Sequence, residues 1–207
     1  MSRRQLAVVF LAPVVLLAVL AGIWGLIAAP AVTSAVTSVL RACTSQEPAM
    51  VQTADCAPGP SVAATATAFG GGDGYVDDPT SSGRVTRRTL HVHDEVARVF
   101  DRSAGVACWD EHAWNPSSDH PRGRACDFTV GRIGARPTAA QRVEGWQLAN
   151  WLRREAGPLG VRYVIFDGKI WSAARDGQGW RPYTGGGVYD PQDVTGGHFD
   201  HVHVSVT

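Results

Sequence analysis

Two histidines and one aspartate have the types and spacing that point to metal chemistry. His120 and Asp127 enclose six residues, and Gly123 between them permits a tight turn through which both side chains could converge. His203 lies 76 positions after Asp127. Two imidazoles and one carboxylate make a three-ligand set that leaves the fourth tetrahedral position open for water, as a catalytic zinc ion requires. We therefore expect a Zn²⁺ site at these residues.

Two more polar residues come just before His203. Asp200 could accept a proton from water whose pKa a zinc ion lowers to about 7. His201 could donate a hydrogen bond to an oxyanion or to the leaving group. The alternative is that these residues and the expected ligands are separate surface side chains, because short motifs carry a false-positive risk.

The tripeptide His-Val-His occurs twice, at 201–203 and at 91–93. The first copy lies in a strand-like run, 201–206, whose alternation puts His201, His203 and Ser205 on one face and the valines on the other. The copy at 91–93 lies in an expected helix over 89–101, where positions i and i+2 diverge by about 200°. We interpret that copy as solvated surface.

The remaining elements suit an antiparallel sheet. Residues 124–130 alternate, so that Asp127 lies opposite an apolar face. Residues 163–172 contain Asp167-Gly168, a strong hairpin signal. A second helix is expected over 138–155. This order predicts an α+β domain in which helices flank an antiparallel sheet.

The N-terminal thirty residues differ from the rest. Leu6–Ala29 is uncharged and as a helix would cover about 36 Å, enough to cross a bilayer. Arg3 and Arg4 before it place the N-terminus in the cytoplasm and everything downstream outside. The length favours a membrane anchor over residues 1–30. The alternative is a signal sequence cleaved near Ala29-Pro30-Ala31, which would leave a secreted protein.

Four cysteines follow this segment. An exported chain with an even number of cysteines most simply forms disulfides, and sequence order pairs Cys43 with Cys56 and Cys108 with Cys126. Zinc ligation by cysteine would call for a C-x-x-C pair, which the chain lacks.

Composition divides the exported part into three segments. We expect a small stapled stalk over 31–56, a flexible linker rich in Gly, Pro, Ser, Thr and Ala over 57–83, and a globular domain over 84–207. The 19 basic and 19 acidic residues give no net charge, so nucleic acid is not an expected partner.

The two polar motifs resemble those of a known superfamily. Ser118–Asp127 fits S-x-H-x-x-G-x-A-x-D of the zinc D-Ala-D-Ala carboxypeptidase and LAS metallopeptidase families, and Asp200–His203 fits their second motif. The resemblance is closest to exported actinobacterial domains of this superfamily and covers 84–207. It implies the hedgehog/DD-peptidase fold.

The resemblance also implies residue roles. His120, Asp127 and His203 would be zinc ligands, Asp200 or His201 would be the base, and Ser118 would support the site. The enzymes of the superfamily carry an upstream arginine that stabilises the oxyanion, whereas 108–116 has none here.

Two other arginines come close to the first motif. Arg122 or Arg124 could replace the upstream arginine, or both could be ordinary surface charges. Asp200 also stands where the superfamily usually has glutamate, and aspartate is one methylene shorter.

Two functions are compatible with these observations. The first is an extracytoplasmic zinc metallopeptidase that hydrolyses the peptide stems of cell-wall peptidoglycan, as a carboxypeptidase or an endopeptidase. The second is a catalytically inactive zinc-binding module that binds a wall component or a protein partner.

Overall fold

The computed structural model of the chain describes residues 62–102 and 104–207. The expected anchor, the stalk and the Cys43–Cys56 pair lie outside these residues. No helix within the described ranges has the length and apolar character needed to cross a membrane. All described residues belong to one unit, Glu47–Thr207.

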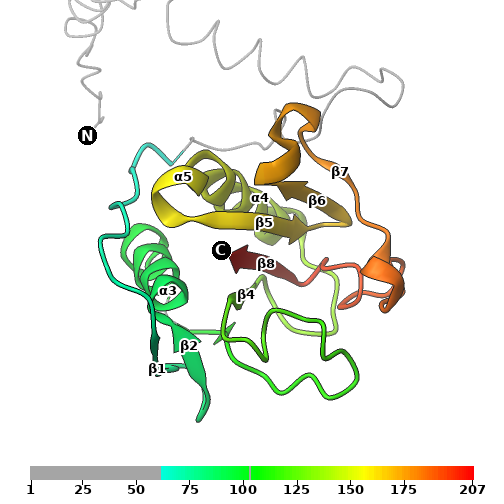
Figure 1. Cartoon of the computed structure of the whole chain (residues 1–207). Coiled ribbons are helices and arrows are strands. Elements are labelled where there is room, and N and C mark those ends of the chain that lie inside the picture. Colours follow the sequence, from blue (N-terminus) through cyan, green and yellow to red (C-terminus); the bar gives the residue numbers. More distant parts are fainter. Residues whose placement is uncertain (1–61, 103) are drawn as a thin grey trace, which may run out of the picture. The chain divides into compact units, whose positions relative to one another are not determined.

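A six-stranded antiparallel sheet forms the centre of the described unit (Figure 1). Its spatial order is β3-β4-β8-β5-β6-β7. The strands are β3 (Val106–Ala107), β4 (Ala125–Thr129), β5 (Val161–Phe166), β6 (Lys169–Ser172), β7 (Arg181–Pro182) and β8 (His201–Val206). A separate pair consists of β1 (Tyr75–Asp77) and β2 (Arg84–Thr86). The expected hairpin is confirmed, since Asp167 and Gly168 both adopt the positive φ of a tight turn between β5 and β6.

Both expected helices are present. They are α3 (Arg87–Phe100) and α4 (Ala139–Arg154), followed by the short α5 (Ala156–Leu159). Thr138 begins α4 with a capping box, in which its hydroxyl accepts a hydrogen bond from the backbone N–H of Gln141. Two 3₁₀ turns, Ala173–Gln178 and Gly185–Gly187, complete the elements.

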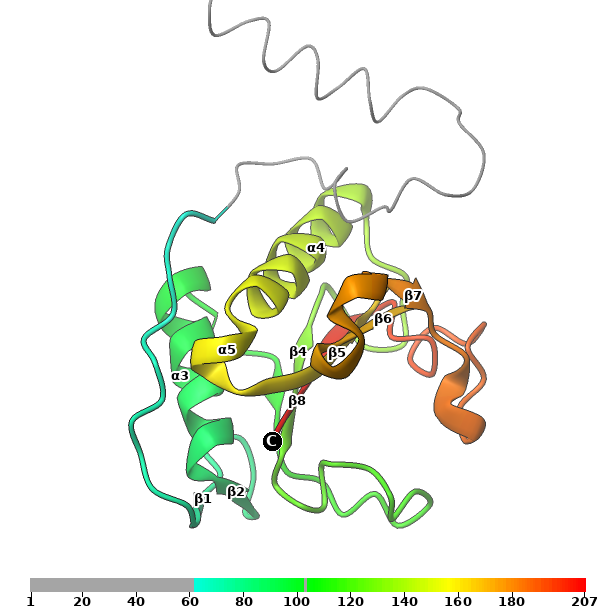
Figure 2. The same cartoon turned by 45° about the horizontal axis from the view of Figure 1, so that its top comes forward.

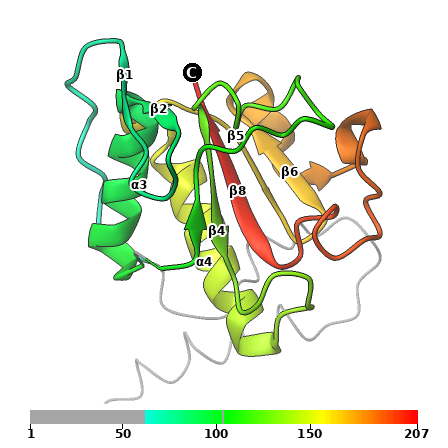
Figure 3. The ribbon, with the colours of Figure 1, turned by 90° about the horizontal axis from the view of Figure 1, so that it is seen from below.

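The helices cover one face of the sheet and leave the other for polar groups. Figures 2 and 3 show α3 and α4 on the same side of β4 and β8. Val202 and Val204 of β8 belong to the buried cluster that includes Trp151 and Leu152 of α4. Alternation along β8 therefore directs His201 and His203 to the opposite face. The predicted α+β architecture with an antiparallel sheet is confirmed.

The segment expected to be a linker contacts the domain from residue 62 onward. The indole of Trp151 donates to the Ala64 carbonyl (2.7 Å), and the Thr67 N–H donates to Glu95 Oε2 (2.7 Å). Further along, β1 pairs with β2. Few large apolar side chains are needed for this arrangement, because backbone groups supply the contacts. Parts of 62–83 therefore contact the domain, although most side chains in this range are exposed. The linker over 57–83 stays a prediction.

Candidate metal centre

Two of the three expected ligands face each other across neighbouring strands. Asp127 of β4 is paired directly with His203 of β8. The Nδ1 atom of His203 lies 2.8 Å from Asp127 Oδ1. Because both side chains point away from the helices, the carboxylate and the imidazole meet on the polar face of the sheet.

A turn before β4 brings the third expected ligand to the same place. His120 Nε2 lies 3.3 Å from Asp127 Oδ2 and 3.2 Å from His203 Nδ1. The turn passes through Gly123, whose φ is +61° and whose backbone approaches β2 so closely that an added Cβ would lie 2.5 Å from the Arg84 carbonyl oxygen. Glycine is thus required here for both reasons.

The three donors form a group that could hold a metal ion, with one ligand atom from each residue within 4.8 Å of the others. The outer nitrogen of each imidazole has a fixed partner. His120 Nδ1 lies 2.6 Å from the Cys108 carbonyl, and His203 Nε2 lies 3.0 Å from Ser205 Oγ. A carbonyl only accepts hydrogen bonds, so Nδ1 of His120 carries a proton, and Nε2 is the nitrogen that would bind a cation once its own proton is lost. The residues present therefore fit a divalent cation.

Without a cation, the charges of the cluster favour a proton on His120. Burial raises the pKa of Asp127, but the His120 and His201 side chains outweigh it and hold the pKa well below the usual value. Burial lowers the pKa of His120, yet the Asp127 carboxylate raises it to about 9. A cation bound here would have to displace the proton that these two residues share.

Neighbouring side chains hold the ligands in place. Ser118 Oγ accepts a weak hydrogen bond from the His120 backbone N–H (3.3 Å). His112 stacks parallel on the His120 ring, with centroids 4.9 Å apart, and Tyr163 stacks on the His203 ring at 5.4 Å. Such stacking restricts the rotation of both imidazoles.

The two residues expected to act as a base have different positions. Asp200 is fully buried, and its Oδ1 accepts from His201 Nδ1 at 2.7 Å. Its Oδ2 accepts from Thr195 Oγ1 and from the Gly134 N–H. His201 Nε2 lies 3.8 Å from Asp127 Oδ2. Asp200 therefore lies behind His201, and His201 is the one beside the cluster.

The pKa values of this pair favour a charged hydrogen bond. Burial raises the pKa of Asp200, but the hydrogen bonds from His201 and Thr195 lower it to about 2. Burial lowers the pKa of His201, but the Asp127 and Asp200 carboxylates raise it overall. A carboxylate behind an imidazole fixes its tautomer and stabilises its cationic form.

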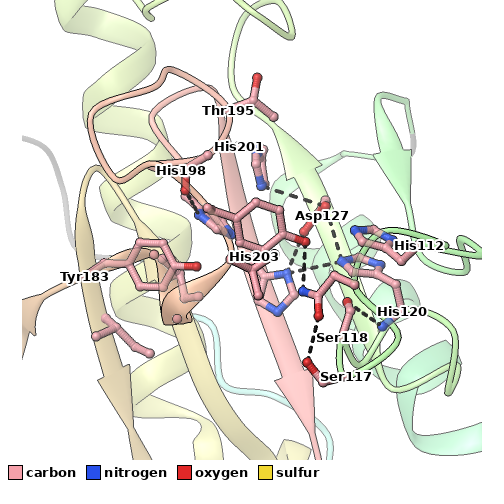
Figure 4. Close-up of a pocket in the computed structure, with 18 of the residues that line it drawn as sticks. His112, Ser117, Ser118, His120, Asp127, Tyr183, Thr195, His198, His201 and His203 are labelled. Atoms are coloured by element: carbon pink, nitrogen blue, oxygen red, sulfur yellow. Dashed lines mark hydrogen bonds and ion pairs between the residues drawn. The ribbon is translucent and has the colours of Figure 1, made fainter.

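The cluster opens into a cavity of about 340 Å³ (Figure 4). Figure 4 shows His112 and His120 on one side and Tyr183 on the other, with His198 next to His201 and His203. The lining residues that sequence reasoning missed include His112, Tyr163, Tyr183 and His198. Tyr163 could have been found from alternation along the expected hairpin, whereas the other three lie in loops without periodicity.

The two arginines considered for oxyanion support do not line this cavity. Arg122 Nη1 lies 3.3 Å from the Ser117 carbonyl and 3.8 Å from Asp119 Oδ1. Arg124 lines a different cavity. The expected disulfide between Cys108 and Cys126 is present, with a sequence separation of 18.

A family model described as VldE, C-terminal domain, matches residues 81–195, which is more than half of the chain. The matched range includes His120 and Asp127 and ends before His203. No curated protein and no solved structure matches the chain.

Proposed function

The chain belongs to the family of the VldE C-terminal domain. From the geometry of its candidate metal site, we propose that it is an extracytoplasmic zinc-dependent peptidase that hydrolyses the peptide stems of peptidoglycan. The observation that carries the proposal is the group His120, Asp127 and His203, which lines a cavity. Zinc is the metal proposed because two imidazoles and one carboxylate are a common catalytic zinc set.

The protein groups around the cluster would divide the work of hydrolysis. When bound, zinc would polarise the scissile carbonyl and make water a better nucleophile near neutral pH. In its neutral form, His201 would accept the proton of the attacking water at Nε2, and its raised pKa would make it a stronger base. It would then pass this proton to the leaving nitrogen. Asp200 would keep His201 in the required tautomer and stabilise its positive charge, as a buried carboxylate does for a catalytic histidine.

The resemblance to the zinc D-Ala-D-Ala carboxypeptidases and the LAS metallopeptidases supports this proposal. Both motifs occur in order, and the residues that match them, from Ser118 to Asp127 and from Asp200 to His203, lie on adjacent strands or the turn before them. The antiparallel sheet with helices on one face agrees with the proposed hedgehog/DD-peptidase fold.

The proposed location and substrate follow from the N-terminal sequence. An apolar run over Leu6–Ala29 after Arg3 and Arg4 would hold the domain outside the membrane, or would direct its secretion if cleaved. A domain held outside the membrane would face the cell wall, and the peptide stems of the wall are the substrates that the resemblance implies.

A second function is a zinc-binding module without activity. The observation in its favour is that Arg122 and Arg124 do not line the cavity, so neither supplies the oxyanion contact that the similar enzymes obtain from arginine. Such a module would bind a wall component or a protein partner through the same cavity.

One experiment separates the two functions. The zinc-loaded full-length chain is incubated with purified peptidoglycan and with synthetic stem peptides, and the products are read by mass spectrometry beside the His203→Ala variant. Hydrolysis by the wild type alone supports the peptidase. Bound zinc without any product from the wild type contradicts it and favours the binding module.

A further inference from the structure

Few of the described side chains that line the metal cavity carry a permanent charge. Among the described residues that line it, Asp127 is the carboxylate, and no lysine or arginine is present. The other lining groups are imidazoles, hydroxyls, an amide, aromatic rings, aliphatic side chains and glycine backbone. Burial raises the pKa of Tyr183 to about 12, so this phenol stays neutral at physiological pH. Among the described lining residues, the cavity therefore offers a carboxylate no lysine or arginine with which to pair.

Two arginines outside the lining, Arg122 and Arg162, are both held by one carboxylate. The buried Asp119, 2% exposed, pairs through Oδ2 with Arg162 and lies 3.8 Å through Oδ1 from Arg122. The Tyr163 hydroxyl also donates to Asp119 Oδ2 at 2.8 Å. These contacts draw both guanidinium groups to Asp119 and away from the cavity, because the buried carboxylate needs their charge.

Two exposed apolar side chains extend the cavity beyond the cluster. Trp114 is 66% exposed and Val188 is 50% exposed, and both line the cavity from separate loops. The loops are joined by a hydrogen bond from Asn115 Nδ2 to the Tyr189 hydroxyl (3.1 Å). Large exposed apolar side chains at a cavity commonly contact a ligand. Here they provide neutral contact surface on both loops for a chain that continues past the cluster.

We propose that this cavity binds the interior of a peptide, with no free carboxylate on the residue that follows the scissile bond, so that the protein is an endopeptidase and not a carboxypeptidase. The inference rests on the proposed peptidase function and specifies its substrate. A terminal carboxylate placed among these walls would lose its hydration without gaining the bidentate contact that an arginine provides, which is unfavourable. An internal amide has no such charge to bury.

The reaction is an ordinary hydrolysis. Water adds across the internal C–N bond, so that the carbonyl carbon gains a hydroxyl group and the leaving nitrogen gains a proton. The first fragment ends in a new carboxylate and the second begins with a new amine. No oxidant or reductant is needed.

A matched pair of substrates tests the inference. The zinc-loaded full-length chain is given acyl-D-Ala-D-Ala with a free C-terminal carboxylate and the same peptide as its C-terminal amide. We expect kcat/KM for the amide to be at least about tenfold higher, the size of one unfavourable charge contact near a protein surface. Equal values, or faster cleavage of the acid, would overturn the inference.

Binding separates this inference from the proposed function. If neither peptide is cleaved, the peptidase proposal fails, and the dissociation constants of both peptides are then measured by calorimetry with the same protein. Tighter binding of the amide supports the inference. Equal binding, or tighter binding of the acid, contradicts it.

A gain of charge provides the second test. Val188→Arg places a cation at the cavity wall, and Val188→Gln is its neutral control. Because Val188 is half exposed, neither change should disturb the core. We expect the acid-to-amide ratio of kcat/KM, or of affinity, to rise about tenfold in the arginine variant only. An unchanged ratio would show that wall charge does not set the preference.

Discussion

The two copies of His-Val-His, on α3 and on β8, have the same sequence and different environments. On α3, His91 Nε2 lies 2.7 Å from the Thr67 carbonyl, while His93 pairs with its neighbour Asp94. On β8, both histidines are buried on one face of the sheet beside Asp127. A strand brings alternate side chains together and a helix separates them. The pair becomes a metal-site candidate only when a strand presents it to a carboxylate on the next strand.

The largest effect is expected at the last histidine of the β8 copy, His203. His203→Ala should reduce bound zinc from about one ion per chain to under about 0.1, and should reduce peptidase activity at least about 10³-fold, because a ligand is lost. His93→Ala is the matched control and should change neither. Zinc content is read by elemental mass spectrometry, with circular dichroism to check folding. Full zinc in the His203 variant would contradict the ligand assignment.

The first histidine of the β8 copy, His201, should separate metal binding from catalysis. His201→Ala should lower kcat by about 10²–10⁴, the usual contribution of a general base, while zinc content stays unchanged. His91→Ala should leave kcat at the wild-type value. If His201→Ala lost zinc as fully as His203→Ala, His201 would be a ligand and its assignment as the base would be wrong.

The Cys108–Cys126 disulfide should stabilise β4 and the turn before it, which lie beside the β8 copy. Replacing Cys108 and Cys126 together with serine should lower the free energy of unfolding by about 3 kcal/mol, because the bridge closes a loop with a sequence separation of 18. It should also weaken zinc binding by about tenfold or more, since the Cys108 carbonyl orients His120. Urea unfolding and zinc titration measure the two effects. Unchanged zinc affinity would show that the disulfide and the ligand turn are independent.

The helix that carries the other copy should show its own pH dependence. The Arg98 guanidinium, against the opposing effect of burial, lowers the pKa of Glu95 to about 2, with help from the Thr67 N–H. A carboxyl group whose pKa is lower in the folded state stabilises the protein above its unfolded pKa of 4.5. This stability, about 1–2 kcal/mol for such a hydrogen-bonded pair, should be lost as the pH falls from about 4.5 towards 2.

Glu95→Gln should remove that part of the pH dependence of urea unfolding, and should leave zinc content at pH 7 unchanged. Asp94→Asn, at an exposed carboxyl on the same helix, is the control and should retain it. A wild-type profile in the Glu95 variant would mean that another carboxyl group is responsible.

Sequence patterns were sufficient for the elements that carry the ligands. Alternation predicted β4 and β8, the Asp167-Gly168 pair predicted their neighbouring hairpin, and Gly123 predicted the turn that returns His120 to Asp127. The position of Asp200 also follows from alternation, because a residue just before His201 faces the other way. Asp200 was expected as a possible base because a carboxylate can accept a proton, but that expectation did not consider which way its side chain faces.

The loop contributions could not be read from the sequence. His112 and His198 reach the cavity from segments without periodicity, and both have positive φ values of 45° and 57°. The contacts that parts of 62–83 make with the domain were also missed, because they depend on backbone hydrogen bonds more than on large apolar side chains. The conformation of such segments depends on tertiary contacts and not on local composition.

The central place of β8 links the assembly of the site to the order of chain synthesis. β8 follows every other described strand in the sequence, yet it lies between β4 and β5 and pairs with both. Until its six residues are made, the two halves of the sheet have no shared partner and Asp127 has no His203 opposite it. Such long-range pairing is slow relative to local contacts. A growing or truncated chain that stops before residue 201 would therefore lack both the continuous sheet and the complete ligand set. Any hydrolytic activity would arise only after the rest of the domain has been synthesised.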